Sequence, residues 1–235
     1  DRGADIFVRA AGGTYLPLRT GKPTGCSPLQ ALDLDDANDF EFLQHWIKKL
    51  VEPDNGKFSV ADNKLIFEAL NQLKTMAPGL RTLETVRGFF SMKDTEGIGA
   101  RLERWFDQGA LSWVFDNSED EISLDQKFIG FDMTDFLDNP EVRTPLMMYL
   151  FHRIEKLIDG RRMVIDIDEF WKALGDDAFR ELAQDKLKTI RKQNGIMVFV
   201  TQSPRDAINS EIGHTIIEQC ATQIFMPNPK GSHKD

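Results

Sequence analysis

The sequence predicts an α/β fold in which a mostly parallel β-sheet carries helices on its faces. Short apolar segments of strand length alternate with amphipathic segments of helix length from residue 127 onward, which is typical of such sheets. A purely helical stretch at 33–106 separates this region from a short N-terminal part. We therefore expect a core built from residues 1–32 and 107–235, with 33–106 as a helical insertion.

The elements follow from local patterns taken in order. Residues 1–30 are short apolar pieces cut by Gly and Pro, which indicates strands and loops with little helix. After the helical stretch, a Thr-Pro pair at 144–145 predicts a helix start, and Gly160 predicts its end. The expected strands are 111–116, 127–134, 163–167, 196–200 and 221–226, and two further helices are expected near 177–190 and 210–219.

The composition of the chain argues against several classes of protein. The chain has 235 residues, 41% of them hydrophobic, and a net charge of −9, so it has enough apolar material for a core. No apolar run approaches the roughly 20 residues that span a bilayer. Two cysteines far apart form neither a metal motif nor a disulfide framework, which favours a reducing cytosol. The acidic balance argues against a grip on nucleic acid by net charge, although a local basic groove is compatible with it, so nucleic-acid binding stays open.

Two adjacent carboxylates follow the expected strand 163–167. In open parallel sheets the reactive groups gather at the carboxyl ends of the strands. Asp168 there would hold the water shell of a magnesium ion, and Glu169 would act as the base that polarises an attacking water. The alternative is an ordinary acidic first turn of a helix. Asp166 lies two residues before Asp168, hence on the same face of the strand, and is a second candidate metal ligand.

An amide follows the next strand. Gln202 lies 202 − 168 = 34 residues after Asp168, a separation suited to one helical crossover between neighbouring strands. From there an amide could contact both a terminal phosphate and the attacking water; the alternative is a polar loop side chain. Arg191 lies in a basic cluster near a helix C-terminus, where cations are favoured in any case. The sharper hypothesis is that Arg191 reaches a neighbouring subunit as an arginine finger.

A phosphate-binding loop of the form G-x-x-x-x-G-K-S/T does not occur in the sequence. Gly21 and Lys22 come nearest, but Pro23 follows them and the earlier glycine is missing. Several longer runs are nevertheless distinctive, among them DRGADIFVRAAGGTYLPL, FIGFDMTDF, RRMVIDIDEFWKAL and IMVFVTQSPRDAINS. Together, and in this order, they resemble the C-terminal ATPase domain of the VirB/Trb/Cag-type ATPases of type IV secretion and conjugation.

The resemblance implies a RecA-like P-loop core with a helical insertion, and ATP hydrolysis with Mg²⁺. It also implies homo-oligomers, with hexamers expected, and docking to other secretion components at the cytoplasmic face of the bacterial inner membrane, where the family powers pilus assembly and substrate export. Asp168 and Glu169 match the family's magnesium and catalytic carboxylates, and Gln202 matches the glutamine of its TQS motif.

The sequence departs from the family pattern at Cys26, Ser27 and Asp166 and in the missing phosphate loop. The missing loop, together with a chain that stops soon after MPNP where the family usually continues, predicts a fragment cut at both ends that lacks the first strand and the loop. Such a fragment is expected to be inactive alone, although the full-length protein is an ATPase. Two rivals stay open: a DNA-translocase or conjugative coupling motor, and a non-hydrolytic scaffold of the secretion machine. The scaffold gains from the missing loop but would have no reason to keep Asp168, Glu169 and Gln202 together.

Overall fold

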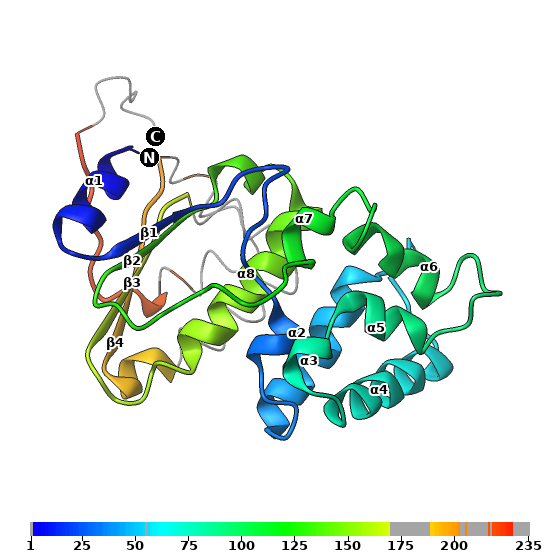
Figure 1. The fold of residues 1–235 in the computed structure, drawn as a ribbon. Helices are drawn as coiled ribbons and strands as arrows, with labels where there is room; N and C mark the ends of the chain where they lie inside the picture. Colours follow the sequence, from blue (N-terminus) through cyan, green and yellow to red (C-terminus); the bar gives the residue numbers. More distant parts are fainter. Residues whose placement is uncertain are drawn as a thin grey trace. The chain divides into compact units, whose positions relative to one another are not determined.

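The computed structural model describes residues 2–54, 56–169, 189–202, 205, 216 and 218–227, apart from the side chains at 2 and 191. The chain forms two compact units, Asp1–Leu157 and Ile158–Asp235, which are described separately, with the labels of Figure 1. The α-helices and strands of the first unit are α1 (Arg2–Ala10), β1 (Thr14–Pro17), α2 (Pro28–Ala31), α3 (Ala37–Leu50), α4 (Val60–Lys74), α5 (Leu83–Gly88), α6 (Ile98–Leu102), α7 (Ser112–Phe115), β2 (Ile129–Asp132) and α8 (Pro140–Glu155). Its 3-10 helices are η1 (Pro78–Leu80), η2 (Glu103–Trp105) and η3 (Thr134–Phe136).

Two strands of the first unit that lie far apart in the sequence form a parallel pair. β1 pairs with β2 in a register that sets Thr14 opposite Ile129 and Pro17 opposite Asp132. The turn before β1 needs a glycine, because a Cβ at Gly13 would lie 2.2 Å from the carbonyl oxygen of Phe128. The parallel strands flank the whole helical region in sequence, as the α/β prediction requires.

The stretch between these strands is helical, as expected. The Asp36 carboxylate caps α3 by accepting hydrogen bonds from two backbone N–H groups, and Ser59 and Asp62 form a capping box that starts α4. The helices bury their apolar faces against one another. Large side chains in this core that are almost fully buried are Leu43, Trp46, Ile47, Ile66, Leu70, Leu73, Leu102 and Trp105.

Helix α8 starts earlier than the sequence suggested. It begins at Pro140 behind the N-cap Asn139, so Pro145 lies inside the helix and not at its first turn. Pro140 already provides a proline at the start of a helix, the position at which its missing N–H costs least. The carbonyl of Pro145 accepts a hydrogen bond of 3.2 Å from the indole Nε1 of Trp46 on α3. This bond and the burial of residues 142–150 tie the interior of α8 to the helical region.

Two further expectations for the first unit are wrong. The apolar run near residues 4–9 forms helix α1 and not a strand; its Asp5 and Arg9, four residues apart, form an ion pair along one helix face. The run at 111–116 forms the short helix α7, in which Val114 and Phe115 are buried. Apolar runs this short suit either conformation. Packing accounts for α7, whereas Ile6 and Phe7 of α1 are largely exposed.

The second unit contains a second parallel pair, β3 (Met163–Ile167) and β4 (Gly195–Phe199), preceded by the 3-10 helix η4 (Ile190–Gln193). The register sets Met163 opposite Gly195 and Ile167 opposite Phe199. Asn194 takes a left-handed conformation before β4, with φ at 61°, and its amide donates to the carbonyl of Gly160 at 2.8 Å. Both central strands of the sequence analysis are therefore confirmed, to within one residue.

The last expected strand, 221–226, does not form: these residues take no strand conformation, and Ile224, Phe225 and Met226 are largely exposed. An apolar run with neither burial nor a paired neighbour does not produce a strand. The helices expected near 177–190 and 210–219 fall mostly outside the described residues. Among the residues that are described, no helix is long and apolar enough to cross a membrane.

Candidate active site

The candidate site lies where β3 and β4 end. Asp168 and Glu169 follow β3 directly, and Thr201 and Gln202 follow β4 after one intervening residue. The strands stay paired up to this point, because the backbone N–H of Val200 donates to the carbonyl of Ile167 at 3.0 Å. The parallel register thus carries both polar segments to the same edge of the sheet, as the sequence analysis expected.

Two of the three predicted residues touch. The side-chain Nε2 of Gln202 donates a hydrogen bond of 2.7 Å to Oε1 of Glu169. Glu169 lies in the left-handed region with φ at 51°, an uncommon conformation for a residue with a side chain. Its backbone N–H donates to Oδ1 of Asp168 at 2.9 Å. Glu169 therefore links the three residues: its backbone N–H bonds the Asp168 carboxylate, and its own carboxylate bonds the Gln202 amide.

Asp166 shares the same strand face as Asp168. Burial and the negative charge of Asp168 raise the pKa of Asp166 above its ordinary value. In β3, Asp166 lies opposite Val198. A cation beside this pair of carboxylates would relieve their mutual repulsion.

The donor chemistry of this edge suits Mg²⁺. Magnesium prefers oxygen ligands, keeps several waters, and is often held by one or two carboxylates together with phosphates of its nucleotide. Asp168, which is exposed, offers such a carboxylate. Within the described ranges, no three His, Cys, Asp or Glu side chains cluster tightly enough to hold a metal alone.

Arg191 is placed only in part. Its backbone belongs to η4, but its side chain lies outside the described residues, so the arginine-finger hypothesis stays a prediction. The neighbours of Gln202 at 203–204 also lie outside them.

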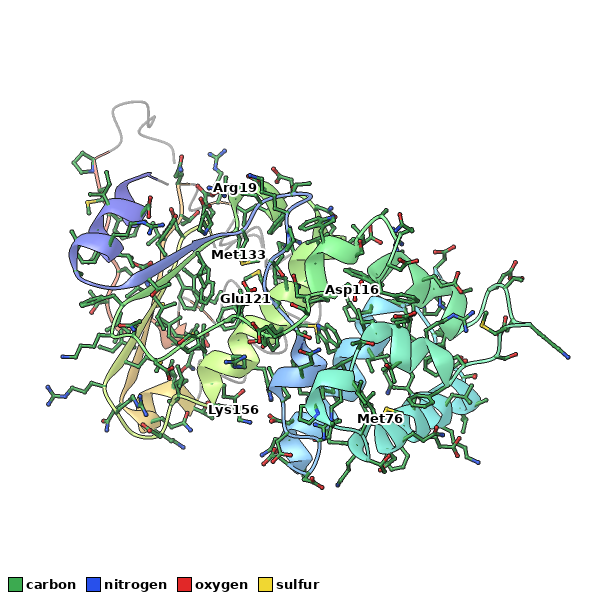
Figure 2. The ribbon with its side chains drawn as sticks, in the orientation of Figure 1. Arg19, Met76, Asp116, Glu121, Met133 and Lys156 are labelled. Carbon is green, nitrogen blue, oxygen red and sulfur yellow. The ribbon has the colours of Figure 1, made fainter. Side chains whose placement is uncertain are left out.

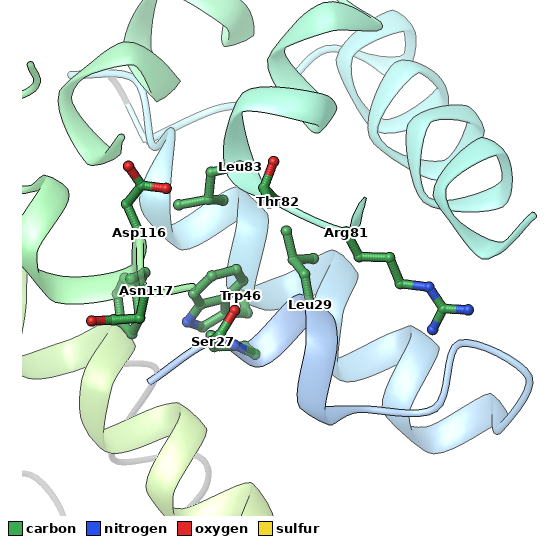
Figure 3. Close-up of a pocket in the computed structure, with 10 residues that line it drawn as sticks. Ser27, Leu29, Trp46, Arg81, Thr82, Leu83, Asp116 and Asn117 are labelled. Carbon is green, nitrogen blue, oxygen red and sulfur yellow. The ribbon is translucent and has the colours of Figure 1, made fainter. Parts of the chain in front are cut away.

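Two hollows lie in the described part of the first unit, and neither is lined by residues at the ends of β3 and β4. The hollow between Leu29, Trp46, Leu83 and Asn117 in the first unit (Figure 3) has a volume of only about 10 Å³, about enough for one water molecule. A larger open groove of about 480 Å³ lies between α3 and α4, lined by Asp36, Phe40, Glu41 and Phe67 among others. The groove also carries acidic and amide side chains, among them Asp35, Glu41 and Gln44. It lies between helices and not at the carboxyl ends of parallel strands, where reactive groups gather in open sheets.

The sequence analysis missed a second polar edge, at the ends of β1 and β2. Arg19 follows β1 (Figure 2), and its Nη2 lies 2.7 Å from Oδ2 of the buried Asp132 at the end of β2. Burial opposes the ionisation of Asp132, but hydrogen bonds from Arg19 and Thr134 outweigh it and lower its pKa to about 2. The available signal was the acid at the end of an apolar strand, the same pattern that pointed to Asp168.

The comparisons with known proteins agree with this fold. The family model described as "TraG P-loop domain" matches residues 81–234. The chain belongs to the TraG P-loop domain family. This TraG P-loop domain is 55% identical, over all 235 of its residues, to the type IV secretion system protein virB4 of Bartonella quintana. It is 41% identical over 230 residues, or 97% of the chain, to protein virB4 of Agrobacterium tumefaciens.

The chain spans about 30% of the length of these relatives. A solved structure of VirB4 of Thermoanaerobacter pseudethanolicus is similar to the TraG P-loop domain with a TM-score of 0.68 at 20% identity, covering 91% of this chain and 63% of that one. At this identity the match speaks for the fold alone. It supports the α/β P-loop architecture that the sequence predicted.

Proposed function

We propose that this chain is the catalytic part of an ATPase that energises a type IV secretion or conjugation system. The relatives at 55% and 41% identity are named as type IV secretion and virB4 proteins, which supports the system. The observation that carries the activity is the hydrogen-bonded edge of Asp168, Glu169 and Gln202 at the ends of two parallel strands.

The roles follow from the chemistry of each side chain. Asp168 holds the water shell of Mg²⁺, with Asp166 as a second ligand candidate. Glu169 accepts the proton of the attacking water, and Gln202 contacts the terminal phosphate and that water. Mg²⁺ bound with the nucleotide neutralises charge on its phosphates. Arg191 is the candidate for a contact to the nucleotide of a neighbouring subunit.

The remaining parts of the proposal concern the longer protein. We expect it to form homo-oligomers, most of all hexamers. We also expect it to work with other secretion components at the cytoplasmic face of the inner membrane. We also expect a G-x-x-x-x-G-K-S/T motif upstream in that protein, since these 235 residues contain none. The isolated 235-residue chain should then bind ATP weakly and not hydrolyse it, because the phosphates lack the amide cradle.

Phosphate release from ATP by the full-length protein tests the function. We expect Mg²⁺-dependent turnover that Asp168→Asn reduces by about a hundredfold or more, the scale on which removal of one group that stabilises transition-state charge acts. Asp159→Asn is the matched control, because Asp159 is an exposed acid of the same unit, paired with Arg161. A full-length protein without turnover, or an Asp168→Asn variant as active as Asp159→Asn, would overturn the proposal.

A further inference from the structure

The direct contact between Glu169 and Gln202 restricts what the Gln202 amide can do. An ionised carboxylate only accepts hydrogen bonds, so the amide must turn its NH₂ group toward Glu169. Without such a partner, the last torsion of a glutamine is broad and roughly two-fold, and the carbonyl and NH₂ groups exchange places at little cost. Glu169 thereby fixes which end of the Gln202 amide points where.

The orientation matters for the ligand that this edge would meet. The amide has two N–H donors and one carbonyl acceptor, and the contact with Glu169 uses one donor. The second donor and the carbonyl keep set directions relative to it. Phosphate oxygens accept hydrogen bonds, so a set N–H donor favours them, whereas a flipped amide would present a carbonyl that repels them.

We propose that Glu169 orients the amide of Gln202 through this hydrogen bond, so that the second N–H of Gln202 donates to the terminal phosphate of a nucleoside triphosphate. The inference rests on the proposed function and adds a second role for Glu169, positioning Gln202, beside its role as base. It predicts that Glu169 raises the preference of the protein for triphosphate over diphosphate through its hydrogen bond. Its negative charge alone would act in the opposite direction, by repelling the additional phosphate.

Charge-matched variants separate these two effects. Glu169→Gln and Glu169→Met both remove the charge and keep the side-chain length. Only glutamine retains an oxygen that accepts a hydrogen bond from Gln202. Any difference between the two variants therefore reports the contact and not the charge.

The measurement is the dissociation constant of a non-hydrolysable ATP analogue and of ADP for the full-length protein with Mg²⁺. We expect the triphosphate preference of Glu169→Gln to exceed that of Glu169→Met by about three- to tenfold, the typical worth of one hydrogen bond. In a Gln202→Met background the difference should vanish, because the amide is gone. ADP serves as the internal control for folding and for the rest of the nucleotide site.

With Gln202 in place, the inference would be overturned if Glu169→Gln and Glu169→Met preferred the triphosphate over ADP equally. A stronger triphosphate preference in Glu169→Met would overturn it as well. So would a difference of the same size in the Gln202→Met background. A wild-type protein that binds neither nucleotide would instead contradict the proposed function itself. A Glu169→Met variant that loses the far-ultraviolet circular dichroism of the wild type would be replaced by Glu169→Leu, which is also neutral and without an acceptor.

Discussion

Asp39 on α3 is fully buried and contacts two basic side chains, His152 near the end of α8 and Lys156 at its C-cap. Its Oδ1 accepts a hydrogen bond of 2.7 Å from His152 Nε2, and its Oδ2 accepts one of 2.5 Å from Lys156 Nζ. Its side chain is 0% exposed, while those of His152 and Lys156 are 11% and 47% exposed. Asp39→Asn keeps the shape but replaces one carboxylate oxygen with an NH₂ group that faces donors.

The expected cost follows from these exposures. A hydrogen bond between largely buried groups, one of them charged, contributes about 1.5–3 kcal/mol, which applies to His152. The contact with the half-exposed Lys156 contributes about 0.5 kcal/mol, as for surface ion pairs. We therefore expect Asp39→Asn to lower the free energy of unfolding by about 3 kcal/mol. For a domain of this size that lowers the Tm by about 6–12 °C.

Thermal unfolding followed by tryptophan fluorescence measures this shift, since Trp46 and Trp105 lie in the same core. Asp35→Asn is the matched control: Asp35 pairs with Lys74 at 2.7 Å but is 72% exposed, so its loss should cost less than about 1 kcal/mol. A Tm for Asp39→Asn within 2 °C of that for Asp35→Asn would refute the reasoning.

The pH dependence gives a second test of the same contact. Burial opposes the ionisation of Asp39, but hydrogen bonds from Lys156 and His152 outweigh it and hold its pKa below the ordinary value. A lowered folded-state pKa stabilises the protein above the unfolded-state pKa of about 4, and this stabilisation is lost as the pH falls through the folded-state value. The difference in Tm between wild type and Asp39→Asn should therefore shrink between pH 6 and pH 3.

Two further predictions concern buried groups. Tyr149→Phe should lower the free energy of unfolding by about 1.5–3 kcal/mol, because the fully buried hydroxyl donates to the Asp120 carboxylate; a loss below 0.5 kcal/mol in urea unfolding would contradict this. Iodoacetamide should label Cys220 well before Cys26 in the native protein, because Cys26 is fully buried and burial raises its pKa to about 12. Equal labelling rates, measured by peptide mass spectrometry, would show that Cys26 is accessible.

The parallel strand pairs could be predicted because their signals are local. MVIDI and IMVFV are compact apolar runs followed by polar residues, and the structure forms strands at both, to within one residue, and pairs them in parallel. The edge at Asp168 and Gln202 followed from the rule that parallel strands end together.

The wrong predictions concern short apolar runs that can form either a strand or a helix. IFV in α1 and WVF in α7 suit strands by composition, but both form helices. In α7 the burial of Val114 and Phe115 outweighs a weak local preference, whereas Ile6 and Phe7 of α1 are largely exposed. The run QIFM at 223–226 has no paired strand among the described residues, and it stays exposed without becoming a strand.

Contacts between distant residues could not be predicted at all. Asp39 and His152 lie 113 residues apart, and no local pattern marks them as partners. The bond from Gln202 to Glu169 depends on the left-handed backbone at Glu169, which a Glu in a sequence does not announce. The sequence therefore predicted that these residues lie at the same edge of the sheet, but not that Gln202 and Glu169 form a hydrogen bond there.

The central claim is that Glu169 is the base of an ATP-hydrolysing site. Its most direct test is the single-turnover rate of ATP hydrolysis by full-length Glu169→Gln, measured beside the wild type at saturating Mg²⁺ with the protein in excess over ATP. The account predicts a loss of about a hundredfold or more, as for removal of a general base, with ATP still bound. Hydrolysis at the wild-type rate would contradict it.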